Sequence, residues 1–303
     1  MDENIILVDW LSITSNELDE FGFQLLLGME DVPWELTRGA HGYQDRLYFG
    51  GISIHYNGRD DMGVWCEMSG QGCRTFESLG HGSYQKLFKF GSSGHGNITR
   101  LDIAYDDHIG VLDLDEIVED TLHQRFVSKS KWWDVNISSE GKSLYHGSPK
   151  SDIRIRIYDK AAERHCVEDT HWIRVELQLR RDRAKKFISM DEDIGYLFAG
   201  VVCNYLRYVI PEESDSNRWR WPLTDYWAEL LCGANAITLY EKPGMEYNLD
   251  RCENYVYKFA GNAIDALIQI YGEKTFLAKL GERHTRKNPK YDQLVAMYKD
   301  FVL

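Results

Sequence analysis

Three segments of the chain alternate strictly between apolar and polar residues, the pattern of a β-strand with one buried face. In residues 151–160, Ile153, Ile155 and Ile157 occupy one side of the predicted strand. The other side carries a tyrosine among cations, namely Arg154, Arg156, Tyr158 and Lys160. This segment therefore predicts a strand that buries its isoleucines and displays a basic face bearing one tyrosine.

Residues 99–106 and 172–180 repeat the alternation, with carboxylates among their polar residues. The polar side of the first segment contains Arg100, Asp102 and Asp106, and that of the second contains Arg174, Glu176, Gln178 and Arg180. Because residues i and i+2 of a strand share a face, one sheet containing all three strands would bring a tyrosine, several acids and several arginines together.

Strand-like runs continue to about residue 186 and predict an α+β domain. The predicted strands are 5–14, 46–56, 63–68, 98–106, 153–160 and 172–180, and the predicted helices are 69–87 and 113–125. Strands and helices separated by short turns indicate an open, mainly antiparallel sheet with helices on one face. The other face is then free to be a functional polar face.

From about residue 187 the apolar residues follow helical spacing instead. The helical segments are 224–231, 254–271, 274–280 and 291–301. We therefore predict an α+β domain at residues 1–186, which carries the polar faces described above, and a mainly helical C-terminal region at residues 187–303.

The charge of the chain is unevenly distributed. The net charge is −13, yet residues 141–186 carry 12 basic and 7 acidic side chains, whereas residues 1–140 carry 10 and 24. A chain this acidic is not expected to coat nucleic acid nonspecifically, because affinity for phosphate depends on local Lys and Arg density. The basic island contains Tyr158, so any contact with phosphate is expected there.

The sequence has no basic apolar leader, and no apolar run approaches the roughly 18 residues that span a bilayer. Its six cysteines form no C-x-x-C pair, which favours free thiols over disulfides or zinc ligands. We expect a cytoplasmic protein without a membrane partner.

Two kinds of chemistry suit the polar faces. A tyrosine nucleophile needs nearby cations to stabilise its phenolate, and Arg154, Arg156 and Lys160 share the face of Tyr158. Carboxylates on neighbouring strands provide the oxygen ligands that Mg²⁺ and Mn²⁺ take, and the candidates are Asp102, Asp106 and Glu176. A purely structural interpretation also stays open, in which Arg100, Arg154 and Arg174 pair with these acids across the strands.

At these residues the chain resembles the replication initiation factor family, the Rep-trans group of rolling-circle plasmid initiators with related relaxases of conjugative elements and phage replication proteins. The resemblance spans residues 9–184. It rests on five blocks in order: DWLSIT at 9–14, MSGQGCR at 68–74, ITRLDIAYDD at 98–107, RIYDK at 156–160 followed by Glu163, and RVE at 174–176.

The resemblance implies a DNA nickase that starts rolling-circle replication. Tyr158 would attack one strand at a replication origin, become joined to the 5′ phosphate and leave a free 3′ hydroxyl, with Arg156 and Lys160 as further catalytic residues. Asp102, Asp106 and Glu176 would hold Mg²⁺ or Mn²⁺, with Asp107 and Glu163 as substitutes. The expected DNA contacts are Arg74, Arg100, Arg154, Arg174 and Arg180. The expected partners are single-stranded or cruciform origin DNA, a host helicase and a second copy of the chain.

Two other functions remain as alternatives. A carboxylate-metal nuclease would use Asp102, Asp106 and Glu176 with water as the nucleophile, and it would leave no covalent adduct. A non-catalytic module would bind single-stranded DNA through aromatic side chains beside a basic groove.

Overall fold

The computed structural model describes residues 4–79, 82–139, 141–166, 170–232, 237, 239, 253 and 256–283. The chain divides into two compact units, Met1–Tyr240 and Glu241–Leu303. Each unit is described by itself.

The first unit is organised around a ten-stranded sheet whose neighbouring strands all pair antiparallel. The strand order is β2-β3-β4-β5-β1-β6-β11-β10-β9-β8. The bounds are β1 Ile5–Ser15, β2 Glu35–Arg38, β3 Asp45–Phe49, β4 Ile52–Tyr56, β5 Val64–Met68, β6 Asn97–Asp107, β8 Trp133–Ser138, β9 Gly141–His146, β10 Ile153–Asp159 and β11 Ile173–Arg180. This confirms the predicted open antiparallel sheet. A separate pair is formed by β7 (Phe126–Ser128) and β12 (Leu206–Tyr208).

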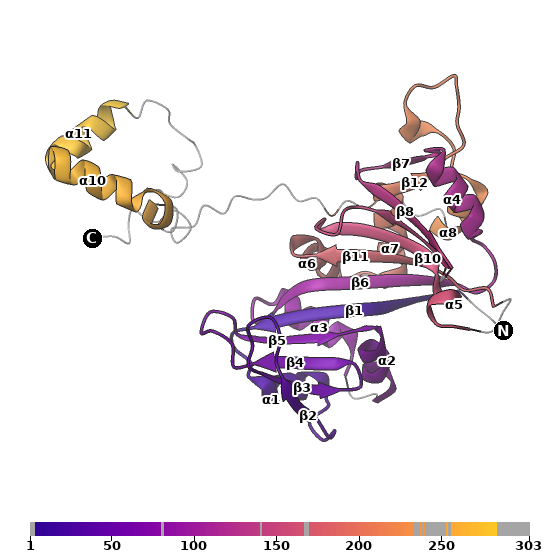
Figure 1. Cartoon of the computed structure of the whole chain (residues 1–303), viewed down its shortest axis with the longest axis horizontal. Coiled ribbons are helices and arrows are strands. Elements are labelled where there is room, and N and C mark those ends of the chain that lie inside the picture. The colour runs from indigo at the N-terminus through magenta and orange to yellow at the C-terminus, as the bar shows by residue number, and fades with distance from the viewer. Residues whose placement is uncertain are drawn as a thin grey trace. The chain divides into compact units, whose positions relative to one another are not determined.

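Helices cover one face of the sheet and leave the other open. In Figure 1, α3 (Tyr84–Ser92), α6 (Asp182–Ser189) and α7 (Ile194–Tyr205) lie behind the sheet. The remaining helices of this unit are α1 Glu20–Leu27, α2 Gly70–Leu79, α4 Leu114–Leu122, α5 Lys160–Glu163 and α8 Asp225–Leu231. No helix among the described residues is long and apolar enough to cross a membrane.

The core forms between this helical layer and the apolar face of the central strands. Ile103, Leu177 and Ile155 from three neighbouring strands are all fully or nearly fully buried. The helices supply Phe187 and Phe198, which belong to the same buried cluster. The side chains that alternate with these residues point to the open face, so the period-2 pattern of the sequence is realised as predicted.

Two predicted elements are each split by a local turn. The run 46–56 forms β3 and β4, because Gly50 and Gly51 both adopt positive φ angles, of 53° and 92°, and close a tight hairpin. The run 69–87 forms α2 and α3, because the hydroxyl of Ser83 accepts a hydrogen bond from the backbone N–H of Lys86 and caps a new helix.

The predicted boundary at residue 186 does not coincide with the division in the structure, which falls after Tyr240. Phe198 of α7 stacks against Tyr105 of β6 with ring centroids 6.4 Å apart, and Trp227 of α8 is fully buried in the core of the first unit. Helical periodicity marks where helices lie in the sequence, but it does not specify the surface on which their apolar faces are buried.

The second unit contains helical segments near those predicted. A π-helix at Val256–Ala260 is followed by α10 (Gly261–Tyr271) and α11 (Glu273–Arg283). The segment predicted at 291–301 lies outside the described residues.

Candidate active site

The register of three central strands brings the polar faces found in the sequence side by side. Tyr158 of β10 is paired with Arg174 of β11, and Arg174 is paired with Asp106 of β6. Arg156 is likewise paired with Glu176. Since directly opposed residues project to the same face of a sheet, these five side chains share the open face.

The hydroxyl of Tyr158 lies between a carboxylate and an ammonium group. It donates a hydrogen bond to Oε2 of Glu176 at 3.3 Å and accepts one from Nζ of Lys160 at 3.3 Å. The guanidinium carbon of Arg156 lies 3.6 Å from the centroid of the tyrosine ring. A potential proton acceptor and two cations therefore surround one phenol.

Burial keeps this phenol protonated in the DNA-free protein. Only 2% of Tyr158 is exposed, and burial together with the negative charge of Glu176 raises the pKa of the phenol, against the opposing charges of Arg174 and Arg156. A nucleophilic phenolate thus requires that its proton be accepted when substrate binds.

The two cations beside Tyr158 converge on one acidic side chain. Lys160 forms an ion pair with Glu163, and Nη1 of Arg156 lies 3.5 Å from Oε1 of the same carboxylate. Although burial opposes the shift, these cations lower the pKa of Glu163. Lys160 and Arg156 are thus already arranged around an anion next to the phenol.

Arg174 lies at the centre of a buried ionic network. It bonds both oxygens of Asp106, at 2.6 and 2.7 Å, and its Nη1 lies 2.8 Å from Oδ2 of Asp9. Arg174 is 3% exposed, and although burial opposes the shift, Asp106 and Asp9 raise its pKa. The prediction that Arg174 contacts DNA is not supported by this position, because its guanidinium is neutralised and covered.

Asp9 is a site residue that the sequence patterns did not single out. The register between β1 and β6 shifts between Val8 and Trp10, which leaves Asp9 at a bulge that directs its carboxylate toward Arg174. A Cβ added to Gly70, at the start of α2, would lie 2.9 Å from Oδ1 of Asp9. Asp9 is the first residue of the first block of the family resemblance, and that block was the signal in the sequence that could have identified it.

Asp102 lies on the same face in a different ionic environment. Arg100 donates to both of its carboxylate oxygens, including Nε to Oδ1 at 3.0 Å, and only 1% of Asp102 is exposed. Burial raises the pKa of Asp102 to about 7; the hydrogen bond from Arg100 opposes this shift, and the nearby charge of Glu176 adds to it. Asp102 and Glu176 therefore repel one another when both are ionised.

The three carboxylates predicted as metal ligands do not form a preformed cluster. Across the described residues, no three acidic, histidine or cysteine side chains are placed to hold a metal ion. Asp106 has both oxygens bound by Arg174, so it is committed to the ionic network. Asp102 and Glu176 remain, together with Gln178, which is paired with Asp102 and donates to Oε1 of Glu176 at 2.6 Å.

The amide oxygen of Gln178 makes this narrower set suitable for a hard cation. It is buried and accepts no hydrogen bond within the described part of the chain. An unpaired buried acceptor is costly, and a divalent cation is one partner that would satisfy it. Two carboxylates and one amide oxygen are ligands of the type that Mg²⁺ and Mn²⁺ prefer.

Asp107 and Glu163, the predicted substitutes, have other partners. Asp107 accepts hydrogen bonds from the backbone N–H groups of Ile109, Gly110 and Leu112 and from His171. Although burial opposes the shift, these bonds lower the pKa of Asp107. Asp107 thus fixes the loop after β6, whereas Glu163 pairs with Lys160 and Arg156 beside Tyr158.

The other arginines predicted to contact DNA differ in whether their guanidinium groups already have partners within the protein. Arg74 bonds the carbonyl oxygen of Val8 at 2.6 Å and Glu77 at 2.7 Å, and Arg180 donates to the carbonyl oxygen of Pro149. Within the described part of the chain, Arg154 bonds only a carbonyl oxygen, that of Gly147 at 3.2 Å, and pairs with no carboxylate. Arg154 and Arg180, which each bond a carbonyl oxygen rather than a carboxylate, are therefore the more available of these cations.

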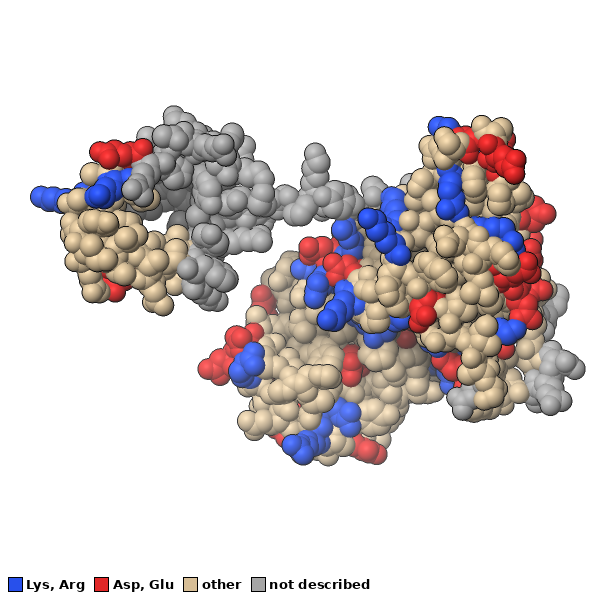
Figure 2. All heavy atoms as spheres, turned by 45° about the horizontal axis from the view of Figure 1, so that its top comes forward, with Lys and Arg blue, Asp and Glu red and all other residues tan. Residues whose placement is uncertain are grey.

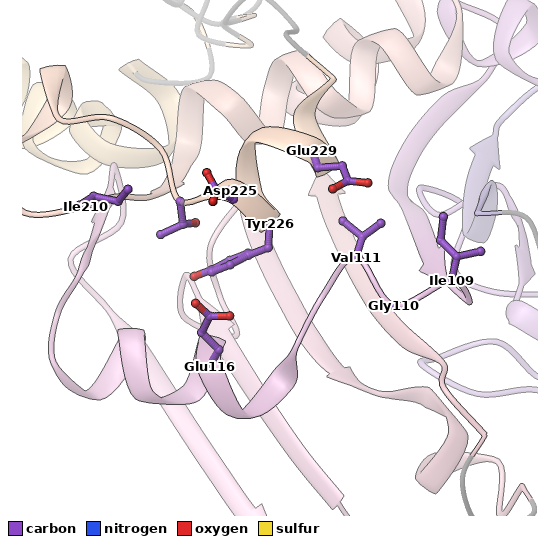
Figure 3. Close-up of a pocket in the computed structure, with 9 residues that line it drawn as sticks. Ile109, Gly110, Val111, Glu116, Ile210, Asp225, Tyr226 and Glu229 are labelled. Atoms are coloured by element: carbon purple, nitrogen blue, oxygen red, sulfur yellow. The ribbon is translucent and has the colours of Figure 1, made fainter.

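Elsewhere on the first unit the charge is mixed. On the face of this unit that Figure 2 shows, Lys and Arg side chains gather near the middle and acidic side chains lie along one edge. A cavity of about 510 Å³ is lined by Glu116 of α4 and by Asp225, Tyr226 and Glu229 of α8, as Figure 3 shows. Burial and neighbouring acids raise the pKa of Glu116. This acidic cavity is unsuited to phosphate and includes none of the predicted site residues.

Comparison with known proteins identifies two adjoining family regions. Residues 96–280 match the model of the replication initiation factor family, and residues 5–92 match that of the rolling circle replication initiation protein N-terminal domain. The first match includes Asp102, Tyr158 and Glu176, and the second includes Asp9.

Individual relatives agree with these matches. "Putative DNA relaxase NicK" of Bacillus subtilis (strain 168) is 27% identical over 265 residues, which cover 80% of this chain and 75% of NicK. The solved structure of a rolling circle replication initiator protein from Geobacillus stearothermophilus is 31% identical, with a TM-score of 0.69, and the match covers 79% of this chain and all of that one. The chain therefore belongs to the replication initiation factor family.

Proposed function

We propose that this protein nicks one strand of origin DNA through a covalent 5′-phosphotyrosine intermediate formed by Tyr158. The observation that carries the proposal is the position of the Tyr158 hydroxyl, 3.3 Å from both Glu176 and Lys160. A general base and the nucleophile that it activates need to be within hydrogen-bond reach of each other. Family membership supports the choice of DNA as substrate.

Glu176 is the proposed general base. As the phenol oxygen bonds to phosphorus, its proton passes to Oε2 of Glu176, and the bond between phosphorus and the 3′ oxygen breaks. The departing 3′ oxygen takes a proton from solvent water and becomes the free hydroxyl. The reverse reaction, attack of a 3′ hydroxyl on the phosphotyrosine, would rejoin a strand.

Lys160 and Arg156 are proposed to stabilise the developing negative charge. Both lie against Tyr158 and both pair with Glu163 in the DNA-free protein. A scissile phosphate entering the site would replace this carboxylate as their anionic partner. Positioned cations contribute most where charge develops in a site sheltered from water.

The proposed metal is Mg²⁺ or Mn²⁺, held by Asp102, Glu176 and the amide oxygen of Gln178. When bound, such a cation polarises a phosphodiester oxygen and offsets charge in the transition state. In this proposal Asp106 is a positioning residue that fixes Arg174 rather than a metal ligand.

The proposed partners follow the same function. Single-stranded or cruciform origin DNA would supply the unpaired strand, a host helicase would unwind the duplex from the nick, and a second copy of the chain would supply a second tyrosine at termination. Sedimentation of the full chain with and without nicked DNA tests the dimer, and an unchanged monomer in both would contradict it.

Covalent capture tests the central proposal. The protein is incubated with Mn²⁺ and labelled single-stranded oligonucleotides that tile the DNA carrying its gene, and denaturing gels are used to detect a protein–DNA adduct. The wild type and the control Tyr196→Phe, a change on α7 at a side chain that is 48% exposed, are expected to form the adduct. Tyr158→Phe is expected to form none while still binding DNA.

The same experiment separates the alternatives. Cleavage without an adduct, equal in the wild type and Tyr158→Phe, would identify a nuclease that uses water. Binding without cleavage in every protein and with every oligonucleotide would identify a non-catalytic single-strand binder.

A further inference from the structure

Two stacks of arginine on aromatic rings lie on the open face of the sheet, the face that also carries Tyr158. The guanidinium carbon of Arg154 lies 4.1 Å from the ring centroid of Tyr145 on β9, and that of Arg100 lies 4.3 Å from the ring centroid of Trp10 on β1. All four side chains are partly exposed. They are thus accessible, in contrast to the buried phenol of Tyr158.

Strand register places the two stacks at opposite ends of one row across the sheet. Trp10 is paired with Asp102, Asp102 with Gln178, and Gln178 with Arg154. Arg154 stacks diagonally on Tyr145 of the next strand, which is itself paired with Arg156 in the adjacent row. Four inter-strand spacings of about 4.8 Å separate β1 from β9, so the stacks are about 19 Å apart.

The reacting groups lie in the rows next to this one. Glu176 and Arg156 form the next pair on this face, two residues along their strands from Gln178 and Arg154. Tyr158 lies two residues beyond Arg156 on β10. Arg156 contacts both aromatic rings, with its guanidinium carbon 3.6 Å from the Tyr158 centroid and 5.7 Å from the Tyr145 centroid. A ligand on the Tyr145 stack would therefore be next to the nucleophile.

The chemistry of these stacks suits unpaired nucleobases. Bases stack on aromatic side chains and on guanidinium planes, and this attraction tolerates different base sequences because every base has a π face. Arg154 has no acidic partner among the described residues, so its charge is available to a backbone phosphate. Arg100 is neutralised by Asp102, which leaves the Trp10 stack mainly as a flat apolar surface.

We propose that Tyr145 with Arg154 and Trp10 with Arg100 are two base-stacking subsites for the unpaired scissile strand, one on each side of the reacting groups. This inference rests on the proposed function only in taking the bound strand to be the one that is nicked. The row implies that the strand crosses the sheet from β1 to β9 rather than running along β10.

Equilibrium binding tests the two subsites. Fluorescence anisotropy with labelled oligo-dT is measured for the full chain in a Tyr158→Phe background, which prevents cleavage. Tyr145→Leu and Trp10→Leu are each expected to raise Kd about 5- to 150-fold, the range expected for losing one stacked base. Tyr145→Phe and Trp10→Phe keep a ring and are expected to retain affinity near that of the parent.

Three controls isolate stacking from other effects. Tyr196→Leu, on the helical side of the unit, is expected to leave Kd unchanged. The leucine variants are expected to keep their melting temperatures and their affinity for duplex DNA, because paired bases are not available for stacking. Arg154→Gln is expected to reduce the salt dependence of Kd, whereas Tyr145→Leu leaves that dependence unchanged.

Several results would overturn the inference. Parent-like affinity of both leucine variants would show that the rings do not bind bases, and equal losses in the phenylalanine and leucine variants would exclude stacking as the cause. The proposed function is tested separately in proteins that keep Tyr158. There the two leucine variants should form the covalent adduct slowly at low DNA concentration, and at the parental rate when they are saturated with DNA. An adduct formed with Tyr158→Phe would reject the nucleophile but leave the stacking result intact.

Discussion

Arg174 binds both carboxylate oxygens of Asp106, through Nε at 2.6 Å and Nη2 at 2.7 Å. The two residues are directly opposed on β11 and β6, and both are almost fully buried. A bidentate bond between buried charges fixes the distance and orientation of two strands that also carry Glu176 and Asp102. The pair thus acts as a structural support beneath the candidate active site.

Removing Arg174 is expected to destabilise the first unit strongly. Arg174→Met leaves the carboxylates of Asp106 and Asp9 without their cation, and breaking a buried pair in this way costs about 3–5 kcal/mol. The control is Arg181→Met, which removes an exposed pair with Asp152 and should cost at most about 1 kcal/mol. Urea unfolding of both variants measures the difference, and equal costs would contradict this role for Arg174.

Glu176→Gln is expected to slow adduct formation by at least about 10²- to 10⁴-fold, the usual contribution of a general base, because it removes the proposed base and also a proposed metal ligand. The amide keeps the shape of the side chain but cannot accept the phenol proton, so DNA binding should be retained. Glu119→Gln makes the same chemical change at an exposed position on α4 and should leave the rate unchanged. Single-turnover kinetics on saturating DNA gives both rates, and an undiminished rate for Glu176→Gln would assign the proton to another acceptor.

Metal binding is expected to depend on Asp102 and Glu176 rather than on Asp106. A cation that binds only the folded chain raises the melting temperature by mass action, so Mn²⁺ should stabilise the wild type. Asp102→Asn and Glu176→Gln should lose most of this thermal shift. Asp106→Asn should lower the starting stability but keep the shift, and the opposite pattern would restore Asp106 as a ligand.

Gly72 is expected to be required for packing. A Cβ at this position would lie 2.3 Å from the carbonyl oxygen of Gly51, on the tight hairpin between β3 and β4. Gly72→Ala should therefore cost about 1–3 kcal/mol, as overpacking typically does. Gly281→Ala, in α11 with nothing within 4 Å of the added atom, should increase helicity without loss of stability. Circular dichroism during urea unfolding compares the two, and tolerance of Gly72→Ala would refute the steric argument.

His146 is expected to make stability depend on pH. Burial lowers its pKa to about 3 from an ordinary value of 6.5, and its Nε2 lies 3.0 Å from the hydroxyl of Tyr208. Between these two pKa values the unfolded chain binds a proton at this residue that the folded chain does not. His146 therefore leaves the free energy of unfolding unchanged above pH 6.5 and lowers it progressively as the pH falls below that value. The loss is about 1.4 kcal/mol per pH unit.

The comparison with His146→Gln isolates this group, because glutamine can still bond Tyr208 but does not titrate. The raised pKa of Asp102 acts in the opposite direction over pH 7 to 4, and it is present in both proteins. Stability relative to the wild type should therefore shift in favour of His146→Gln as the pH falls from 6.5 to 4.5. A constant difference across that range would show that His146 is protonated in the folded state.

Much of the fold could be predicted because the period-2 alternation assigns each side chain of a strand to a face. On β10 the three isoleucines face the helices, and the side chains that alternate with them, Arg154, Arg156 and Tyr158, face the opposite way. Alternation along a single strand is enough to predict this arrangement. The proximity of Arg156 to Tyr158 also follows locally, since i and i+2 residues share a face, whereas Lys160 begins α5 rather than continuing the predicted strand. These relationships need no knowledge of neighbouring strands.

The sequence by itself determined the faces of the strands, the basic surroundings of Tyr158 and, through five short blocks, the family resemblance. Only the tertiary structure decided which acid meets which cation, because strand order and register are set by pairing between distant segments. Thus Asp106 is committed to Arg174, Asp9 enters the site through a bulge, and Asp102 remains beside Glu176 and Gln178. The end of the first unit was also set by tertiary packing, because the apolar faces of α7 and α8 are buried in its core. Amphipathic spacing alone does not specify the surface against which a helix packs.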